Sequence, residues 1–126
     1  MKRKLIVVIV ITATTFVICY AYNNFFTKGM LTGSYINQNY HYSPNKVEIP
    51  YSPDTLSLFK NNQFVSNYWG KGSYNIRYTV RGTEIELIYN YRFGKAGYRT
   101  SIKRLDFGTP KIILDIDRNH YYEKLE

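Results

Sequence analysis

The chain has 126 residues, a formal charge of +8, one cysteine and two histidines, so it is long enough for one domain but excludes an internal disulfide framework and a Cys/His zinc finger. A hydrophobic fraction of 44% excludes wholesale disorder. Fourteen tyrosines favour strands over helices.

The positive charge falls into two parts. Lys2, Arg3 and Lys4 precede an apolar run, and without them 14 basic residues face 9 acidic ones, a charge of +5 over residues 5–126. A basic flank before an apolar run keeps the N-terminus in the cytoplasm. The basic excess is therefore partly a targeting feature, and we expect no nucleic-acid partner.

The stretch from residue 5 to residue 21 contains no charged residue, glycine or proline. At helical rise it covers about 26 Å, slightly short of a ~30 Å hydrocarbon core, and the aromatic residues that follow, including Phe25 and Phe26, extend it as an interfacial belt. We predict a cytoplasmic basic flank over 1–4 and a transmembrane anchor or signal segment over 5–22, with everything from about residue 27 outside the cytoplasm. The residues that mark this segment are Leu5, Ile18, Tyr20 and Tyr22.

Two other fates of this segment stay open. The triplet Cys19-Tyr20-Ala21 has the layout of a signal-peptide cleavage site, in a moderate form. Alternatively, Cys19 is lipidated, although a bacterial lipoprotein signal needs a small residue before the cysteine and Ile18 stands there. A buried helix of a cytosolic protein is disfavoured by the basic flank and the uniform apolarity.

Period-2 alternation dominates the rest of the chain, after a linker over 23–30. In the clearest strand, Ile85, Leu87 and Tyr89 share one face. The predicted strands are 33–42, 55–59, 64–69, 73–80, 84–93, 98–104, 111–116 and 120–125, joined mostly by short turns rich in Gly and Asn. We predict an all-β domain over 31–126, an antiparallel up-and-down meander of about eight short strands that closes like a barrel, first strand against last.

Several short motifs support this layout: Leu31-x-Gly33-x-Tyr35, then Pro53-Asp54-x-Leu56-x-Leu58 with an Asn-rich turn into Phe64, then Gly70-x-Gly72-x-Tyr74. Over 31–126 the chain resembles the small bacterial lipocalin-like domains. The resemblance implies an eight-stranded barrel and an association with the binding of apolar ligands.

Aromatic residues precede glycine at three expected turns, those of Trp69, Phe93 and Phe107. Turns alternate between barrel ends in a meander. The turns that contain Trp69 and Phe93 would therefore lie at the same end and form a rim with neighbouring lysines. The rim candidates are Trp69, Lys71, Phe93 and Lys95, and the inward tyrosines whose hydroxyls could meet a lipid headgroup are Tyr74, Tyr78, Tyr89 and Tyr91. The simpler interpretation is that glycine supplies the turn and the aromatic ring caps the barrel.

Other polar patterns are weaker. Asp115-x-Asp117-x-Asn119 resembles the opening of a calcium loop, but His120 stands where that loop needs glycine. His41 and His120 could lie close together on the two closing strands, without an identified nucleophile or metal-ligand partner. We therefore expect no enzyme activity, no cofactor and no metal site.

Three functions fit the sequence. The first is a membrane-anchored or exported barrel that acts as a binding or interaction module at the cell envelope, with the membrane as one partner and a lipid or a protein as another. The second is a lipocalin-like carrier of a small apolar ligand or lipid. The third is an inhibitor or immunity-type protein that binds a protein partner.

Overall fold

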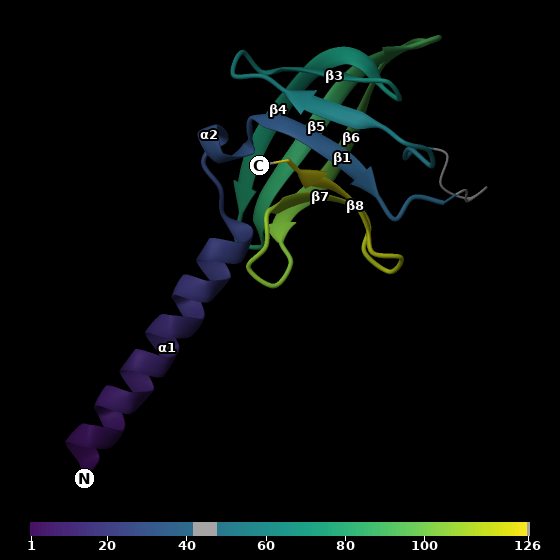
Figure 1. The fold of residues 1–126 in the computed structure, drawn as a ribbon. Helices are drawn as coiled ribbons and strands as arrows, with labels where there is room; N and C mark the ends of the chain where they lie inside the picture. The colour runs from purple at the N-terminus through teal and green to yellow at the C-terminus, as the bar shows by residue number, and fades with distance from the viewer. Residues whose placement is uncertain (42–47, 126) are drawn as a thin grey trace.

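A long apolar helix leads into a small barrel in the computed structural model, which describes residues 1–41 and 48–125 (Figure 1). The helix α1 spans Lys2–Asn24 and buries none of its residues. Its length and mean hydropathy of 2.4 are those of a membrane span or a signal segment. A second, four-residue helix, α2, spans Lys28–Leu31 and was not predicted.

Eight strands follow, and each pairs in antiparallel fashion with its neighbour in sequence. They are β1 (Gly33–Gln38), β2 (Thr55–Leu58), β3 (Gln63–Ser66), β4 (Gly70–Thr79), β5 (Gly82–Tyr91), β6 (Gly94–Arg104), β7 (Pro110–Asp115) and β8 (His120–Lys124). β8 pairs with β1, with Tyr122 opposite Asn37, and this pairing closes the barrel. The predicted eight-stranded antiparallel meander is confirmed.

The barrel interior is filled by the alternate side chains of each strand. Tyr74 on β4 lies opposite Leu87 on β5, which lies opposite Tyr98 on β6, so one row of the pleat points inward across three strands. The fully buried large side chains include Tyr35, Leu56, Leu58, Phe64, Tyr74, Ile85, Leu87, Ile102, Ile112 and Tyr122. Tyrosine therefore serves mainly as a core residue in this chain.

Two predicted turns are in the wrong place. The β5–β6 turn consists of residues 92–93, and the predicted turn 94–97 is instead strand, with Gly94 opposite Tyr91. Likewise the β3–β4 turn consists of residues 67–69, and Gly72 belongs to β4. Positive φ at Gly94 (134°) lets the strand leave a two-residue turn directly. The predicted loop from Ser43 to Lys46 lies outside the described residues.

The two ends of the barrel differ. We call the end that joins α1 the proximal end; it carries the turns at residues 59–62, 80–81 and 105–109. We call the other end the distal end; it carries the turns at residues 67–69, 92–93 and 116–119. Phe26 (3% exposed) and Leu31 belong to the core, so the chain between α1 and β1 plugs the proximal end. Phe26 is therefore a core residue and does not lie in an interfacial belt.

Several hydrogen bonds fix α1 to the barrel. Thr83 Oγ1 on β5 donates to Asn24 O (2.9 Å) and accepts from Phe26 N (3.3 Å). Tyr20 donates to Val80 O (2.9 Å), and Tyr78 donates to Phe26 O (2.6 Å). We call this set of hydrogen bonds the bonded junction between α1 and the barrel. Tyr20 and Phe26, which were predicted as interfacial aromatics, take part in it together with β4 and β5.

Candidate functional site

The turn between β5 and β6 presents an exposed aromatic tip. It projects beyond the rest of the barrel, away from α1 (Figure 1). Phe93 is 79% exposed and Tyr91 is 50% exposed, with ring centroids 6.1 Å apart in an edge-on arrangement. The Arg92 guanidinium lies 5.5 Å from the centre of the Phe93 ring. This tip, Tyr91–Phe93, combines aromatic area and positive charge, the side chains that dominate protein-binding surfaces.

Among the residues that the structure describes, the side of β6 away from β5 has no strand partner over the part of its length next to this tip. Among the described residues, β7 pairs with β6 only at Ile102, Lys103 and Arg104. Over residues 94–99 the described part of the chain pairs with this strand on the β5 side alone, whereas at Thr100 the side-chain hydroxyl donates to Ile113 O of β7. An unpaired edge offers backbone donors and acceptors to another extended segment. Lys95 and Arg99 point to the outer face of this edge, and Arg99 pairs with Glu86 at 3.0 Å.

The buried carboxylate of Asp54 forms hydrogen bonds with residues at the distal end. Asp54 is 5% exposed, and its Oδ2 accepts hydrogen bonds from Ser66 Oγ (2.8 Å) and from the Tyr122 hydroxyl. Its Oδ1 accepts from the backbone N–H of Asn67 (2.9 Å). Three donors compensate for the burial of one charge. This network joins β3, β8 and the segment before β2, and no sequence pattern marked Asp54 as its centre.

A second polar pair closes the seam between the first and last strands. Asn37 Oδ1 and His120 Nε2 lie 2.7 Å apart, and both residues are buried. The ring of His41 lies 6.4 Å from the ring of His120, as the expected pairing of the closing strands implied. His41 Nε2 also lies 2.5 Å from Arg118 Nη1. These contacts join β1 and the residues after it to β8 and the β7–β8 turn.

Trp69 is a core residue, which corrects its predicted position on an exposed rim. Its side chain is 6% exposed and packs on four tyrosine rings. Ser66 Oγ accepts from the backbone N–H groups of Tyr68 (3.0 Å) and Trp69 (3.1 Å), so the turn is held with the indole inward. The tyrosines around it are Tyr68, Tyr89, Tyr98 and Tyr122, with ring centroids 5.1–6.3 Å away.

The remaining rim and tyrosine candidates separate into three groups. Lys71 and Lys95 are exposed and lie at the same, distal end of the barrel, in β4 and β6 and not in the turns where they were predicted. The hydroxyls of Tyr74 and Tyr78 are occupied, since they donate to Phe59 O (2.5 Å) and Phe26 O (2.6 Å). Tyr89 packs against Trp69, and Tyr91 extends into the exposed tip. The structure therefore brings Tyr91, Phe93 and Lys95 together and separates them from the other candidates.

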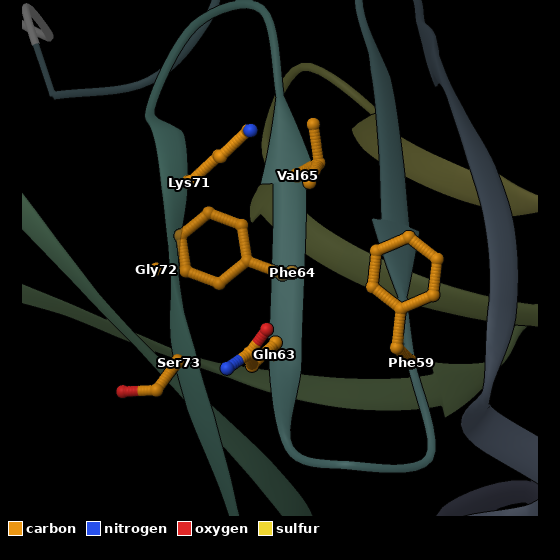
Figure 2. Close-up of a pocket in the computed structure, with 7 residues that line it drawn as sticks. All are labelled: Phe59, Gln63, Phe64, Val65, Lys71, Gly72 and Ser73. Atoms are coloured by element: carbon orange, nitrogen blue, oxygen red, sulfur yellow. The ribbon is translucent and has the colours of Figure 1, made fainter.

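A cavity of about 280 Å³ lies across β3 and β4, outside the core (Figure 2). It is lined by Phe59, Gln63, Phe64, Val65, Lys71, Gly72 and Ser73. The Phe64 ring extends toward Gly72, where an added Cβ would lie 2.7 Å from the ring and 2.1 Å from Ile88 O. Glycine is needed here for close packing. The volume falls just below the range typical of small-molecule sites, so this cavity does not suggest a ligand site.

Burial shifts the acidity of the interior tyrosines. Desolvation is the main cause that raises the pKa of Tyr98, to about 12, and a hydrogen bond with Thr100 partly opposes it. Desolvation also raises the pKa of Tyr122, and the hydrogen bond to Asp54 adds to the rise. Both phenols therefore stay neutral, and Tyr122 acts as a donor to the carboxylate. Within residues 1–41 and 48–125, no group of three His, Cys, Asp or Glu side chains is arranged to hold a metal ion.

The fold and these sites define a class of molecule: a closed eight-stranded antiparallel barrel that follows a long apolar helix. Comparison with family models, with curated proteins and with solved structures finds no match for this chain.

Proposed function

We propose that the chain is a membrane-anchored interaction module of the cell envelope that binds a protein partner through its distal end. In this proposal α1 stays in the membrane with its basic flank in the cytoplasm, and the barrel lies outside the cytoplasm. The bonded junction between α1 and the proximal end then directs the distal end away from the membrane.

The observation that carries the proposal is the exposed β5–β6 tip. Phe93 and Tyr91 leave a large aromatic surface in water at the end opposite the helix. Aromatic and arginine side chains provide most of the binding energy in protein interfaces. The unpaired β6 edge beside the tip adds main-chain hydrogen-bonding groups, and Lys95 adds positive charge. The partner we propose is a protein that adds an extended acidic segment to this edge.

The packed interior favours an interaction module over a carrier. Eight short strands enclose a space that side chains can fill or that can hold one small ligand. Here Trp69 and the surrounding tyrosine rings occupy the distal half of that space. A lipocalin-like carrier would have to displace this cluster to admit an apolar molecule.

Site-specific photocrosslinking in intact cells tests the proposal. A photoreactive residue at Phe93 is expected to give one discrete protein adduct, whereas the same residue at exposed Phe59, in the β2–β3 turn at the proximal end, gives none. Arg92→Glu is expected to lower the adduct yield roughly fivefold or more, because a hot-spot charge is reversed, while Lys60→Glu at the proximal end leaves the yield unchanged. Identical adduct patterns from positions 93 and 59 would refute the proposed binding surface.

The anchor is tested separately. After alkaline carbonate extraction the full chain is expected in the membrane pellet with α1 intact, because an inserted helix resists high pH. Recovery of the barrel in the supernatant, with a mature N-terminus beyond residue 19, would show that the segment is a cleaved signal instead.

A further inference from the structure

Phe107 occupies an unusual position in the turn between β6 and β7. It has φ of 63°, and Asp106 before it has φ of 54°. The left-handed region is costly for a bulky side chain, so surrounding contacts must hold the turn in this form. Phe107 is nevertheless 57% exposed. A strained, exposed aromatic residue needs an explanation beyond the packing of the barrel.

The side chain of Phe107 lies along α1. Its ring stacks on Tyr22, with centroids 5.9 Å apart. It also closes one side of an apolar groove of about 430 Å³ whose other wall is the helix itself. The helix residues in this groove are Ile11, Thr12, Thr15, Phe16 and Cys19. Figure 1 shows the β6–β7 loop beside the barrel end of α1. The turn therefore reaches the level of the apolar segment that we assign to the membrane.

A more polar cavity adjoins the groove, with Phe107 common to both. It has a volume of about 530 Å³, and Tyr22, Arg104, Thr109 and Glu123 are among its lining residues. The Arg104 guanidinium lies 4.2 Å from the Tyr22 ring centre and donates to Tyr22 O, which fixes its position. A guanidinium has five N–H donors and matches the geometry of phosphate.

The acidic side chain in this cavity is neutralised locally. Glu123 Oε1 lies 3.7 Å from Lys111 Nζ and accepts a hydrogen bond from Thr109 Oγ1 (3.2 Å). Lys103 and Lys124 lie at the same end of the barrel, near the ends of β6 and β8. The positive charge of Arg104 is therefore not cancelled by Glu123 within the cavity.

We infer that this junction binds one anionic phospholipid. An acyl chain lies in the groove between Phe107 and α1, and the phosphate lies at Arg104. The inference rests on the proposed membrane anchor, because only insertion of α1 places the groove at the depth of acyl chains. It also gives the strained turn a role, since the turn holds Phe107 against the helix and forms the wall of the groove.

Quenching by brominated lipids tests the site in the full chain. Phe107→Trp is reconstituted in phosphatidylcholine vesicles that contain brominated phosphatidylglycerol or, at equal mole fraction, brominated phosphatidylcholine. Trp69 is the only natural tryptophan, and because it is buried at the distal end, the unmodified chain measures the background. Phe93→Trp is the matched control at the exposed distal tip.

We expect quenching above background for Phe107→Trp and none for Phe93→Trp. We also expect roughly fivefold stronger apparent binding of phosphatidylglycerol than of phosphatidylcholine, the gain typical of one basic residue at an anionic surface. Arg104→Gln should reduce this preference to near parity. Arg104→Lys should retain part of it, which separates loss of charge from damage to the junction, and Lys71→Gln at the distal end should leave it unchanged.

Two results would overturn the inference while leaving the anchor intact. The first is equal quenching at positions 107 and 93, and the second is equal quenching by the two lipids. Release of the chain from the vesicles by alkaline carbonate would instead overturn the membrane anchor, and the lipid site with it.

Discussion

At the scale of single residues, polar side chains decide how the distal end is held. Asp54 receives hydrogen bonds from a serine, a tyrosine and a backbone amide, although its side chain is almost fully buried. Ser66, one of these donors, in turn accepts from the backbone of the turn that carries Trp69. One carboxylate therefore links the closing strand to the position of the largest core side chain.

Substitution of Asp54 separates the loss of charge from the loss of acceptors. Asp54→Ala leaves three buried donors unpaired, and we expect a loss of about 3–5 kcal/mol in the free energy of unfolding. In Asp54→Asn the amide oxygen can still accept from Asn67 and the NH₂ can donate to the Tyr122 hydroxyl, whereas Ser66 Oγ already accepts two backbone N–H groups and loses its acceptor, so we expect a smaller loss of about 1–2 kcal/mol. Denaturant unfolding of the full chain in detergent, followed by Trp69 fluorescence, measures both. Equal losses for the two variants would contradict the assigned network.

At the scale of elements, hydrogen bonds join the end of α1 and the residues just after it to β4, β5 and the turn between these strands. Thr83 is buried and bonds to both Asn24 and Phe26 through one hydroxyl. Because Phe26 plugs the proximal end, this hydroxyl couples the helix to the barrel core.

Thr83→Val keeps the shape of the side chain and removes both hydrogen bonds. We expect the free energy of unfolding to fall by about 2 kcal/mol, because the partly buried Asn24 carbonyl and the buried Phe26 N–H lose their partner. Hydrogen exchange of the amides from Phe25 to Thr27 should become faster. Thr55→Val, at an exposed position at the start of β2, is the control and should change neither quantity. Unchanged exchange in Thr83→Val would show that the junction is held by packing alone.

The register of β5 and β6 shows what alternation can and cannot predict. The expected turn at 94–97 would have placed Phe93 opposite Tyr98, whereas Leu87 lies opposite Tyr98 in the structure. The register differs by an even number of residues, so each side chain keeps its face. Tyr98 and Ile102 lie on the inward row of β6, while Phe93, a predicted rim residue, lies in the two-residue turn at the tip of the hairpin. The position of Phe93, on which the proposed function depends, is therefore set by where the β5–β6 turn occurs.

At the scale of the whole molecule, the filled interior determines the response to pH. Burial raises the pKa values of Tyr35, Tyr98 and Tyr122, that of Tyr98 to about 12 from an ordinary value of 10.0. These phenols remain protonated in the folded barrel at a pH where the unfolded chain has released its protons. The unfolded state then binds fewer protons, so the free energy of unfolding falls as pH rises.

We expect stability to be independent of these groups below about pH 10 and to decline above it, for Tyr98 until about pH 12. Denaturant midpoints measured from pH 8 to pH 12, with tyrosinate absorbance recorded in parallel, test this expectation. Tyr98→Phe should make the decline shallower, whereas Tyr91→Phe at the exposed tip should leave it unchanged. A decline that is the same in both variants would assign alkaline unfolding to other groups, such as lysine.

The sequence by itself determined the fold class, the apolar helix and the inward faces of most strands, because all three depend on local composition and on a period of two. It could not place Trp69, since the turn that directs the indole inward is held by Asp54, which comes within hydrogen-bond distance of Ser66 and Asn67 only when β2 pairs with β3. Nor could it assign Phe26 to the core or set Phe107 against α1, because both positions depend on how the helix meets the barrel. Alternation fixes which face a side chain occupies. Only the tertiary structure decides what lies opposite that face, because that neighbour comes from another part of the chain.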